Sequence, residues 1–171
     1  KLNEASLEFA YQGPLMKFNL GKVTGAITGN VTFNIIRKNS KIEKGICYQT
    51  FELNEGDQLD IISTNRSVYG YFSVKNGFVG EYIWESYSVN TKAKIGSNNG
   101  EKFKTNQKIF INKNESISNL KRIDYLNSKI EYIRVLNGTN INFFSENAKE
   151  TFFTKEFRVS KLTDRMGMRL E

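Results

Sequence analysis

The side chains that carry most enzyme chemistry are scarce in this sequence. It contains no histidine and one cysteine, Cys47, so the usual general base and the usual zinc ligands are missing. With no histidine to activate its thiol, Cys47 is better explained as a core or half-buried strand residue between Ile46 and Tyr48 than as a nucleophile. The sequence therefore predicts no catalytic residue, no metal site and no cofactor.

One pair of carboxylates, Glu81 and Glu85, has a spacing that deserves comparison with glycosidases. Glycoside hydrolysis needs two carboxyl groups at a set separation. The spacing of this pair is not diagnostic, and exposed charges at the end of a strand explain it more simply. We therefore expect a protein that is not an enzyme.

Aromatic residues gather around an Asn-Gly turn near the middle of the chain. Asn76-Gly77 suits a two-residue turn with positive φ at both positions, which predicts flanking strands over 69–74 and 78–83. Side chains alternate between the two faces of a strand. This alternation predicts a core face made of Phe72, Val74, Val79 and Ile83.

The opposite face of this predicted hairpin is the candidate binding surface. Flat aromatic rings can stack on sugars or peptide stems, and the polar side chains would orient a ligand. Tyr71 and Trp84 are the strongest candidates. The residues predicted to bind the ligand are Tyr69, Tyr71, Asn76, Phe78, Glu81, Tyr82 and Trp84.

The remaining pattern favours short strands joined by polar turns. One proline, thirteen glycines, thirteen phenylalanines and eight tyrosines are typical of a mostly β protein. Residues 3–10 suit a short helix or an entry strand, and Leu53–Asp57 reads as a turn. Further strands are predicted over residues 18–20, 23–27, 31–36, 58–63 and 151–159.

The segment from Leu53 to Tyr87, with its strands and Asn-Gly hairpin, resembles a bacterial SH3 (SH3b) domain. Phe33-Asn34-Ile35 resembles the Leu-Asn-Val entry of these domains. An Arg usually follows that Val directly, whereas Ile36 precedes Arg37 here, and the usual Gly-Pro is absent. The resemblance implies an SH3-like small barrel over residues 18–90 that recognises cell-wall peptides or glycans, or docks onto other proteins, without catalysis.

The second half contains an echo of the first. Leu126-Asn127 and Phe143-Phe144-Ser145 repeat Leu53-Asn54 and Tyr71-Phe72-Ser73 at nearly constant offsets, which suggests a degenerate tandem repeat. We therefore expect two SH3-like barrels, the second over residues 104–160. The alternative is an α+β second half with a helix near 116–128, because apolar residues recur there at a spacing of three.

Charge helps to rank the candidate functions. The formal charge of +7 favours attraction to anionic polymers, but the basic residues are scattered rather than clustered. The first prediction is a binding module for peptidoglycan or another wall component in the periplasm or cell envelope. The alternatives are a scaffold subunit of a secretion or motility complex, and a nucleic-acid-binding protein. A signal or anchor outside this sequence and a cytoplasmic location both stay open.

Overall fold

The computed structural model describes residues 4–19, 21–113, 121–124, 131–163 and 167–171. The chain divides into two compact units, Lys1–Asn127 (unit 1) and Ser128–Glu171 (unit 2). The predicted module bounds, 18–90 and 104–160, stay a prediction. Each unit is described by itself.

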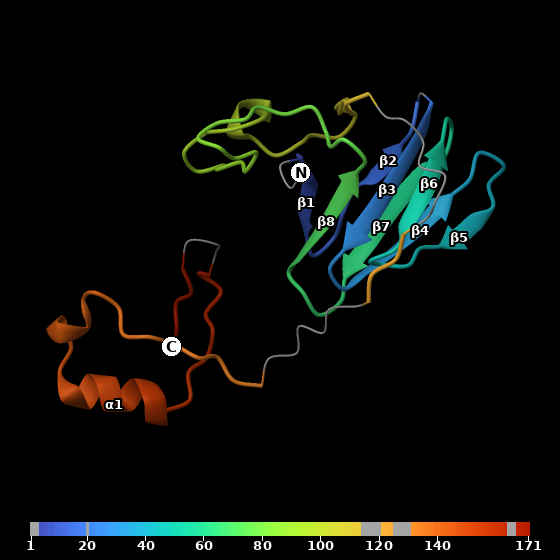
Figure 1. Cartoon of the computed structure of the whole chain (residues 1–171). Helices are drawn as coiled ribbons and strands as arrows, with labels where there is room; N and C mark the ends of the chain where they lie inside the picture. Colours follow the sequence, from blue (N-terminus) through green and yellow to red (C-terminus); the bar gives the residue numbers. More distant parts are fainter. Residues whose placement is uncertain (1–3, 20, 114–120, 125–130, 164–166) are drawn as a thin grey trace. The chain divides into compact units, whose positions relative to one another are not determined.

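Unit 1 is built from two antiparallel four-stranded sheets. Sheet 1 has the order β1-β8-β3-β6, with β1 at Leu7–Ala10, β8 at Tyr69–Val74, β3 at Lys22–Thr28 and β6 at Thr50–Asn54. Sheet 2 has the order β2-β7-β4-β5, with β2 at Leu15–Lys17, β7 at Gln58–Thr64, β4 at Val31–Ile36 and β5 at Ile42–Lys44. Figure 1 shows these strands gathered in one β body.

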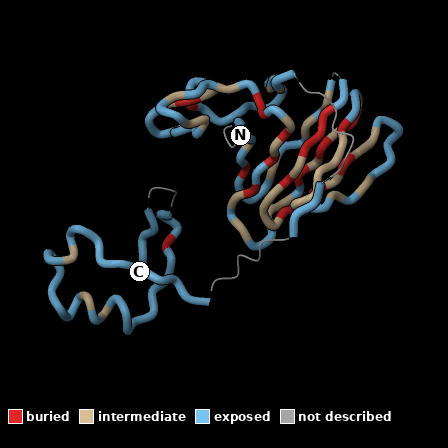
Figure 2. Tube along the Cα trace, viewed as in Figure 1, coloured by how far each residue is buried: buried red, intermediate tan, exposed pale blue. Residues whose placement is uncertain are grey.

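The core lies between the two sheets because alternate side chains of their strands are apolar. The ring of Phe51 on β6 packs 5.4 Å from that of Phe33 on β4 and 6.2 Å from that of Phe72 on β8, measured between centroids. Figure 2 shows the buried positions concentrated in these strands. The largest fully buried side chains are Phe33, Phe72, Ile27, Leu53, Leu59 and Ile61.

The mostly β prediction is confirmed, and so are the strands predicted over 23–27, 31–36, 58–63 and 69–74. The SH3-like barrels are not. Among the described residues no strand ladder joins the two sheets, so unit 1 is an open sandwich rather than a closed barrel.

Asn76 and Gly77 have the predicted positive φ values, 64° and 73°, but the predicted hairpin and the strand after it do not form. The turn is closed by the Gly77 N–H, which donates to the Val74 carbonyl at 3.0 Å, so Lys75 and Asn76 are its central residues. Phe78 then pairs through isolated bridges with Ala5 and Ile111, and its ring packs 5.6 Å from that of Phe72. Contact with the core therefore draws Phe78 inward and leaves Val79 exposed, the reverse of the predicted faces.

Residues 79–110 form a long irregular excursion, which we call the loop arm. The arm leaves the end of β8, and its two ends meet where the Val79 N–H donates to the Phe110 carbonyl at 2.8 Å. Its 3₁₀ turn covers Asn98–Gly100. In Figure 1 it is the green to yellow segment that extends beyond the strands.

Unit 2 contains a 3₁₀ turn at Ile141–Phe143 and a nine-residue helix, α1, at Glu146–Thr154. The Ser145 side chain caps α1 by accepting from the Ala148 N–H at 3.2 Å. The strand predicted over 151–159 is therefore wrong at its start, where residues 151–154 are helical. Phe143 to Ser145 also form a turn and a cap, so they do not repeat the β8 strand.

The alternative helix near 116–128 is not formed in residues 121–124, the part of it that the structure describes. Residues 121–124 are extended, and Lys121 and Ile123 bond to Thr50 and Tyr48 beside the start of β6. The rest of that predicted helix lies outside the described residues.

A test of the sandwich is the close packing of Gly70. On β8 this residue faces Phe9 of β1, and a Cβ added there would lie 2.5 Å from the Phe9 ring. We expect Gly70→Ala to lower the free energy of unfolding by about 1–3 kcal/mol, since overpacking a filled core forces side chains to shift. Chemical denaturation measures this. Gly138→Ala, which meets no atom within 4 Å, is the control, and equal stability of both variants would contradict the packing.

Candidate functional site

An arginine directly after β4 organises one side of unit 1. The Arg37 guanidinium donates from Nε and Nη2 to Glu43 Oε2 at 2.9 and 2.6 Å. Its Nη1 donates to Asp57 Oδ2 at 2.9 Å and to the Glu52 carbonyl at 2.8 Å. Four of the five guanidinium N–H groups are engaged in this way, and one on Nη2 remains.

Asp57 is the buried member of this network, with its side chain 4% exposed. Its carboxylate accepts from Arg37 and from the backbone N–H groups of Lys38 and Asn54, the latter two at 3.0 Å. Burial by itself would raise the pKa of Asp57, but these donors together outweigh it and hold the pKa below its usual range. The carboxylate thus stays charged and joins the turn after β6 to the loop after β4.

A hollow of about 250 Å³ lies beside this network. Ile35, Phe51, Lys44 and Gln49 are among the residues that line it. Among the described residues neither of these two polar side chains has a hydrogen-bond or ion-pair partner. The full lining is Ile35, Arg37, Glu43, Lys44, Gly45, Ile46, Gln49, Thr50, Phe51 and Glu52.

The lining holds two cations, Arg37 and Lys44, and two carboxylates, Glu43 and Glu52. Glu43 is paired with Arg37 and Glu52 with Lys22, so among the described residues Lys44 is the lining cation left to bind a carboxylate. Hydrogen bonding to Glu43 raises the pKa of Arg37, so the guanidinium stays protonated and fixes one wall. The backbone next to Gln49 is paired, because the Thr50 N–H donates to the Lys121 carbonyl at 2.8 Å.

The loop arm contains a second hollow of about 350 Å³, with only polar residues in its lining. These groups largely satisfy one another. The Gln107 amide donates to the Asn98 side chain, its oxygen accepts from the Lys104 N–H at 3.0 Å, and Glu101 pairs with Lys94 at 3.0 Å. The hollow is therefore held together by its own hydrogen bonds, and the first hollow, with its unpaired Lys44 and Gln49, is the stronger candidate.

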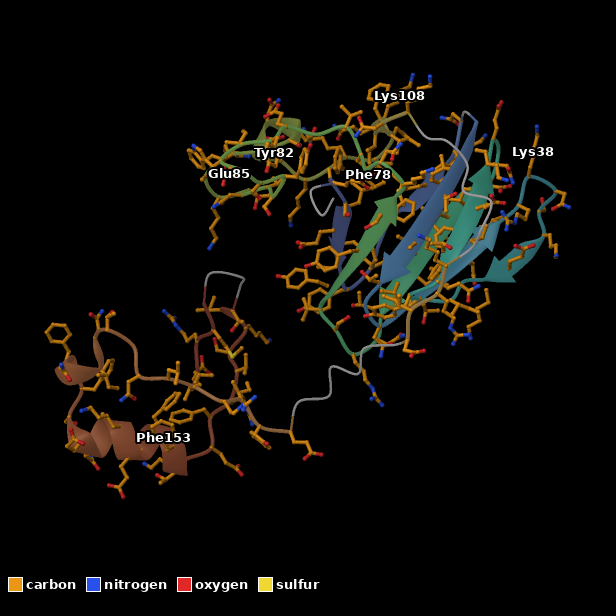
Figure 3. All side chains as sticks on the ribbon, viewed as in Figure 1. Lys38, Phe78, Tyr82, Glu85, Lys108 and Phe153 are labelled. Atoms are coloured by element: carbon orange, nitrogen blue, oxygen red, sulfur yellow. The ribbon has the colours of Figure 1, made fainter. Side chains whose placement is uncertain are left out.

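The residues predicted from the sequence to bind a ligand do not form one groove. Tyr69 and Tyr71 lie on β8, whereas Tyr82 and Trp84 lie on the loop arm, and Phe78 is buried in the core. Figure 3 labels Phe78 by the strands and Tyr82 and Glu85 on the arm.

The other members of that set make local contacts in the loop arm or beside its ends. The Asn76 side chain donates to the Lys113 carbonyl at 2.7 Å, and the Glu81 N–H donates to Ser97 Oγ at 2.7 Å. Tyr82 contacts Tyr87 with ring centroids 4.8 Å apart. Trp84 is 81% exposed, and its φ of 48° is uncommon for a bulky residue. A ligand-binding role for the set stays a prediction.

Sequence reasoning missed Arg37, Lys44, Gln49 and Asp57 as site residues. Arg37 and Asp57 are twenty positions apart, and no local pattern shows that they meet. The one usable signal was Asp57 itself, an acidic residue directly after a turn glycine and before a strand.

The fold and this site can now be compared with known proteins. Over residues 1–171 the chain matches the family model described as "Carboxyltransferase domain, subdomain A and B". The chain therefore belongs to the carboxyltransferase-domain family.

Solved structures share the fold at 22% sequence identity. The match to TTHA0988 has a TM-score of 0.75 and covers 95% of this chain and 57% of that one. Urea amidolyase and urea carboxylase from Kluyveromyces lactis match with TM-scores of 0.73 over 97% of this chain, but over only 11% and 16% of their own lengths. The chain thus spans less than two thirds of each of these proteins. The search of curated proteins gave no match.

These findings overturn several predictions. The chain is not an SH3b domain, and the predicted wall-binding, scaffold and nucleic-acid-binding functions are wrong. The prediction that the protein is not an enzyme is contradicted by the same findings. The same findings contradict the predicted partners, a cell-wall polymer or an envelope protein. The resemblance failed because short strands and an Asn-Gly turn are common to many β folds.

No helix among the described residues is long and apolar enough to cross a membrane, and the predicted periplasmic or envelope location stays a prediction.

The Cys47 thiol is half-buried and donates to the Val31 carbonyl at 3.2 Å. Burial raises the pKa of this thiol, which agrees with a packing role.

Replacing the buried carboxylate tests the network. We expect Asp57→Asn to lower the free energy of unfolding at pH 7 by about 3 kcal/mol, because it removes the charge of a buried ion pair. The folded pKa of Asp57 lies below the ordinary value of 3.8. Its stabilisation is therefore fully present above that value and is lost as pH falls through the folded pKa.

Urea denaturation at a series of pH values measures both effects. The D57N variant should lose less stability than the wild type between about pH 5 and pH 2. Asp60→Asn, a change at a half-buried position on β7, is the matched control. It should lose as much stability as the wild type when the pH is lowered. If the wild type lost no more stability than D57N as the pH was lowered, the network would be contradicted.

Proposed function

We propose that this chain forms part of a carboxyltransferase that moves a carboxyl group to or from the nitrogen of a small amide. The observation that carries the proposal is the family match over all 171 residues. The names of the two yeast relatives, urea amidolyase and urea carboxylase, support a urea-like amide as the substrate class.

The proposed reaction moves one carboxyl group between two nitrogens. The bond from the carboxyl carbon to the donor nitrogen breaks, and a bond from that carbon to the acceptor nitrogen forms. The proton of the acceptor nitrogen passes to the donor nitrogen, so nothing is oxidised or reduced. What the protein must supply is position and charge: a cation for the carboxylate, and polar groups that orient the amide.

The hollow beside Arg37 offers these groups. Lys44 would hold the carboxylate, Gln49 would donate to and accept from the amide, and the Phe51 and Ile35 side chains would limit access of water. Arg37 acts as a positioning residue, because Glu43, Asp57 and the Glu52 carbonyl hold its guanidinium in place. The arrangement thus recognises the carboxylated amide rather than the neutral one.

Biotin supplies the carboxyl group in biotin-dependent carboxylases. The hollow beside Arg37, at about 250 Å³, is smaller than the roughly 300–1,000 Å³ of typical ligand pockets. The loop-arm hollow has only polar residues in its lining. The ureido ring of biotin is polar, but its thiophane ring and acyl chain are apolar, and neither hollow combines enough volume with apolar residues for them. We propose instead that a carboxylase partner presents the carboxyl donor.

Loss of the carboxyl group from N-carboxylated urea tests the activity. In this partial reaction the carbon–nitrogen bond breaks and the nitrogen takes up a proton. With a ¹³C-labelled carboxyl group, NMR should show release at least about tenfold faster with the chain than in buffer, a modest lowering of the barrier for an enzyme. Equal rates with and without folded protein would contradict the proposed activity.

Binding of oxamate, a stable planar amide carboxylate, tests the site separately. We expect Lys44→Gln to weaken oxamate binding about tenfold in calorimetry, since a hydrogen bond to a charged group contributes about 1.5 kcal/mol. Lys41→Gln is the matched control, because Lys41 is on the same hairpin and pairs with Glu43 but lies outside the hollow. Equal weakening by both variants would exclude the hollow as the binding site.

A further inference from the structure

A short segment, residues 121–124, runs beside the start of β6, next to the hollow beside Arg37. The Thr50 N–H donates to the Lys121 carbonyl at 2.8 Å, and the Ile123 N–H donates to the Tyr48 carbonyl at 3.0 Å. The Thr50 hydroxyl also accepts from the Lys121 N–H at 2.7 Å. These bonds fix the segment to the chain that enters β6. In Figure 1 it is the short orange piece between two grey traces.

This pairing sets Arg122 directly opposite Gln49. The two residues form an antiparallel bridge, and the two backbone bonds lie on either side of it, between the neighbouring residues. Such a non-hydrogen-bonded pair is the closer kind, with Cα atoms about 4.5 Å apart and both side chains on one face. The Arg122 side chain therefore leaves the segment on the same side as that of Gln49.

That side faces the opening between the two sheets. Gln49 and Phe51 are two positions apart at the start of β6, so their side chains point to the same face. The Phe51 ring packs between the sheets, against Phe33 and Phe72. Gln49 and Phe51 both line the hollow, whereas Arg122 does not. Arg122 thus lies at the rim of the hollow, on the side of sheet 1.

The Arg122 guanidinium is a cation without a partner in the described part of the chain. Its side chain has no hydrogen bond or ion pair there. The carboxylates in the lining, Glu43 and Glu52, are already in other ion pairs. Asp124, two positions along the segment, forms no ion pair either. The guanidinium is therefore available to an anion in the hollow.

We propose that Arg122 is a second carboxylate-binding residue of the site and closes its open side over the bound ligand. Lys44 comes from β5 of sheet 2, and Arg122 comes from the edge of sheet 1, so the two cations hold the carboxylate of the carboxylated amide from opposite sides. A planar guanidinium can donate two parallel N–H groups to a carboxylate, which an ammonium cannot do. The inference rests on the proposed function and adds to it a residue outside the lining.

Calorimetry with oxamate tests this role. We expect Arg122→Gln to weaken oxamate binding about tenfold, the loss that one charge-assisted hydrogen bond brings. Arg122→Lys keeps the charge but not the paired donors, so it should weaken binding less than Arg122→Gln does. Urea denaturation of each variant checks that the sandwich keeps its stability, since Arg122 is exposed.

Lys121→Gln is the matched control. It removes the same charge from the neighbouring residue, whose side chain points to the opposite face of the segment. It keeps the backbone bonds to Thr50, so the segment stays in place. Oxamate binding should be almost unchanged in this variant.

The outcomes separate this assignment from the proposed function. Equal weakening by Arg122→Gln and Lys121→Gln would be an effect of overall charge and would overturn the role of Arg122. Binding that Lys44→Gln weakens and Arg122→Gln leaves unchanged would overturn that role too, while the hollow remained the site. A wild type that does not bind oxamate at all would overturn both the site and the assignment.

Discussion

The buried Asp57 carboxylate is the interaction on which the candidate site depends. It lies in the turn between β6 and β7 and binds the guanidinium of Arg37 and the backbone after β4. Because a charge this buried is stable only when its acceptors are filled, the two loops cannot separate without a large cost. The β4–β5 hairpin is thereby fixed beside β6, and the hollow between them keeps its shape.

Much of unit 1 could be predicted from the sequence, since apolar alternation determines which residues face the core. The bounds of β4 and β8 agree with the predicted strands, and Asn76 and Gly77 have the predicted positive φ values. Prediction failed where a contact distant in the sequence outweighed the local pattern. Phe78 leaves its hairpin because Ala5, Phe72 and Ile111 offer it a buried position, and the aromatic face predicted around it is divided between β8 and the loop arm.

The candidate site was out of reach of sequence reasoning for the same reason. Arg37 reads as one of many scattered basic residues, and only the fold brings it to Asp57, twenty positions away. Lys44 and Gln49 become candidate site residues only because the fold places them beside apolar residues and the fixed guanidinium of Arg37. The family match gives the family to which the chain belongs, and the carboxylate site beside Arg37 is our proposal from the geometry.

The most direct measurement is a crystal structure of the chain with oxamate bound. The account predicts density for oxamate in the hollow beside Arg37, with its carboxylate at the Lys44 ammonium and its amide at Gln49. Oxamate in the loop-arm hollow, among Asn98, Lys104 and Gln107, would contradict it, and so would an empty hollow beside Arg37 in crystals saturated with the ligand.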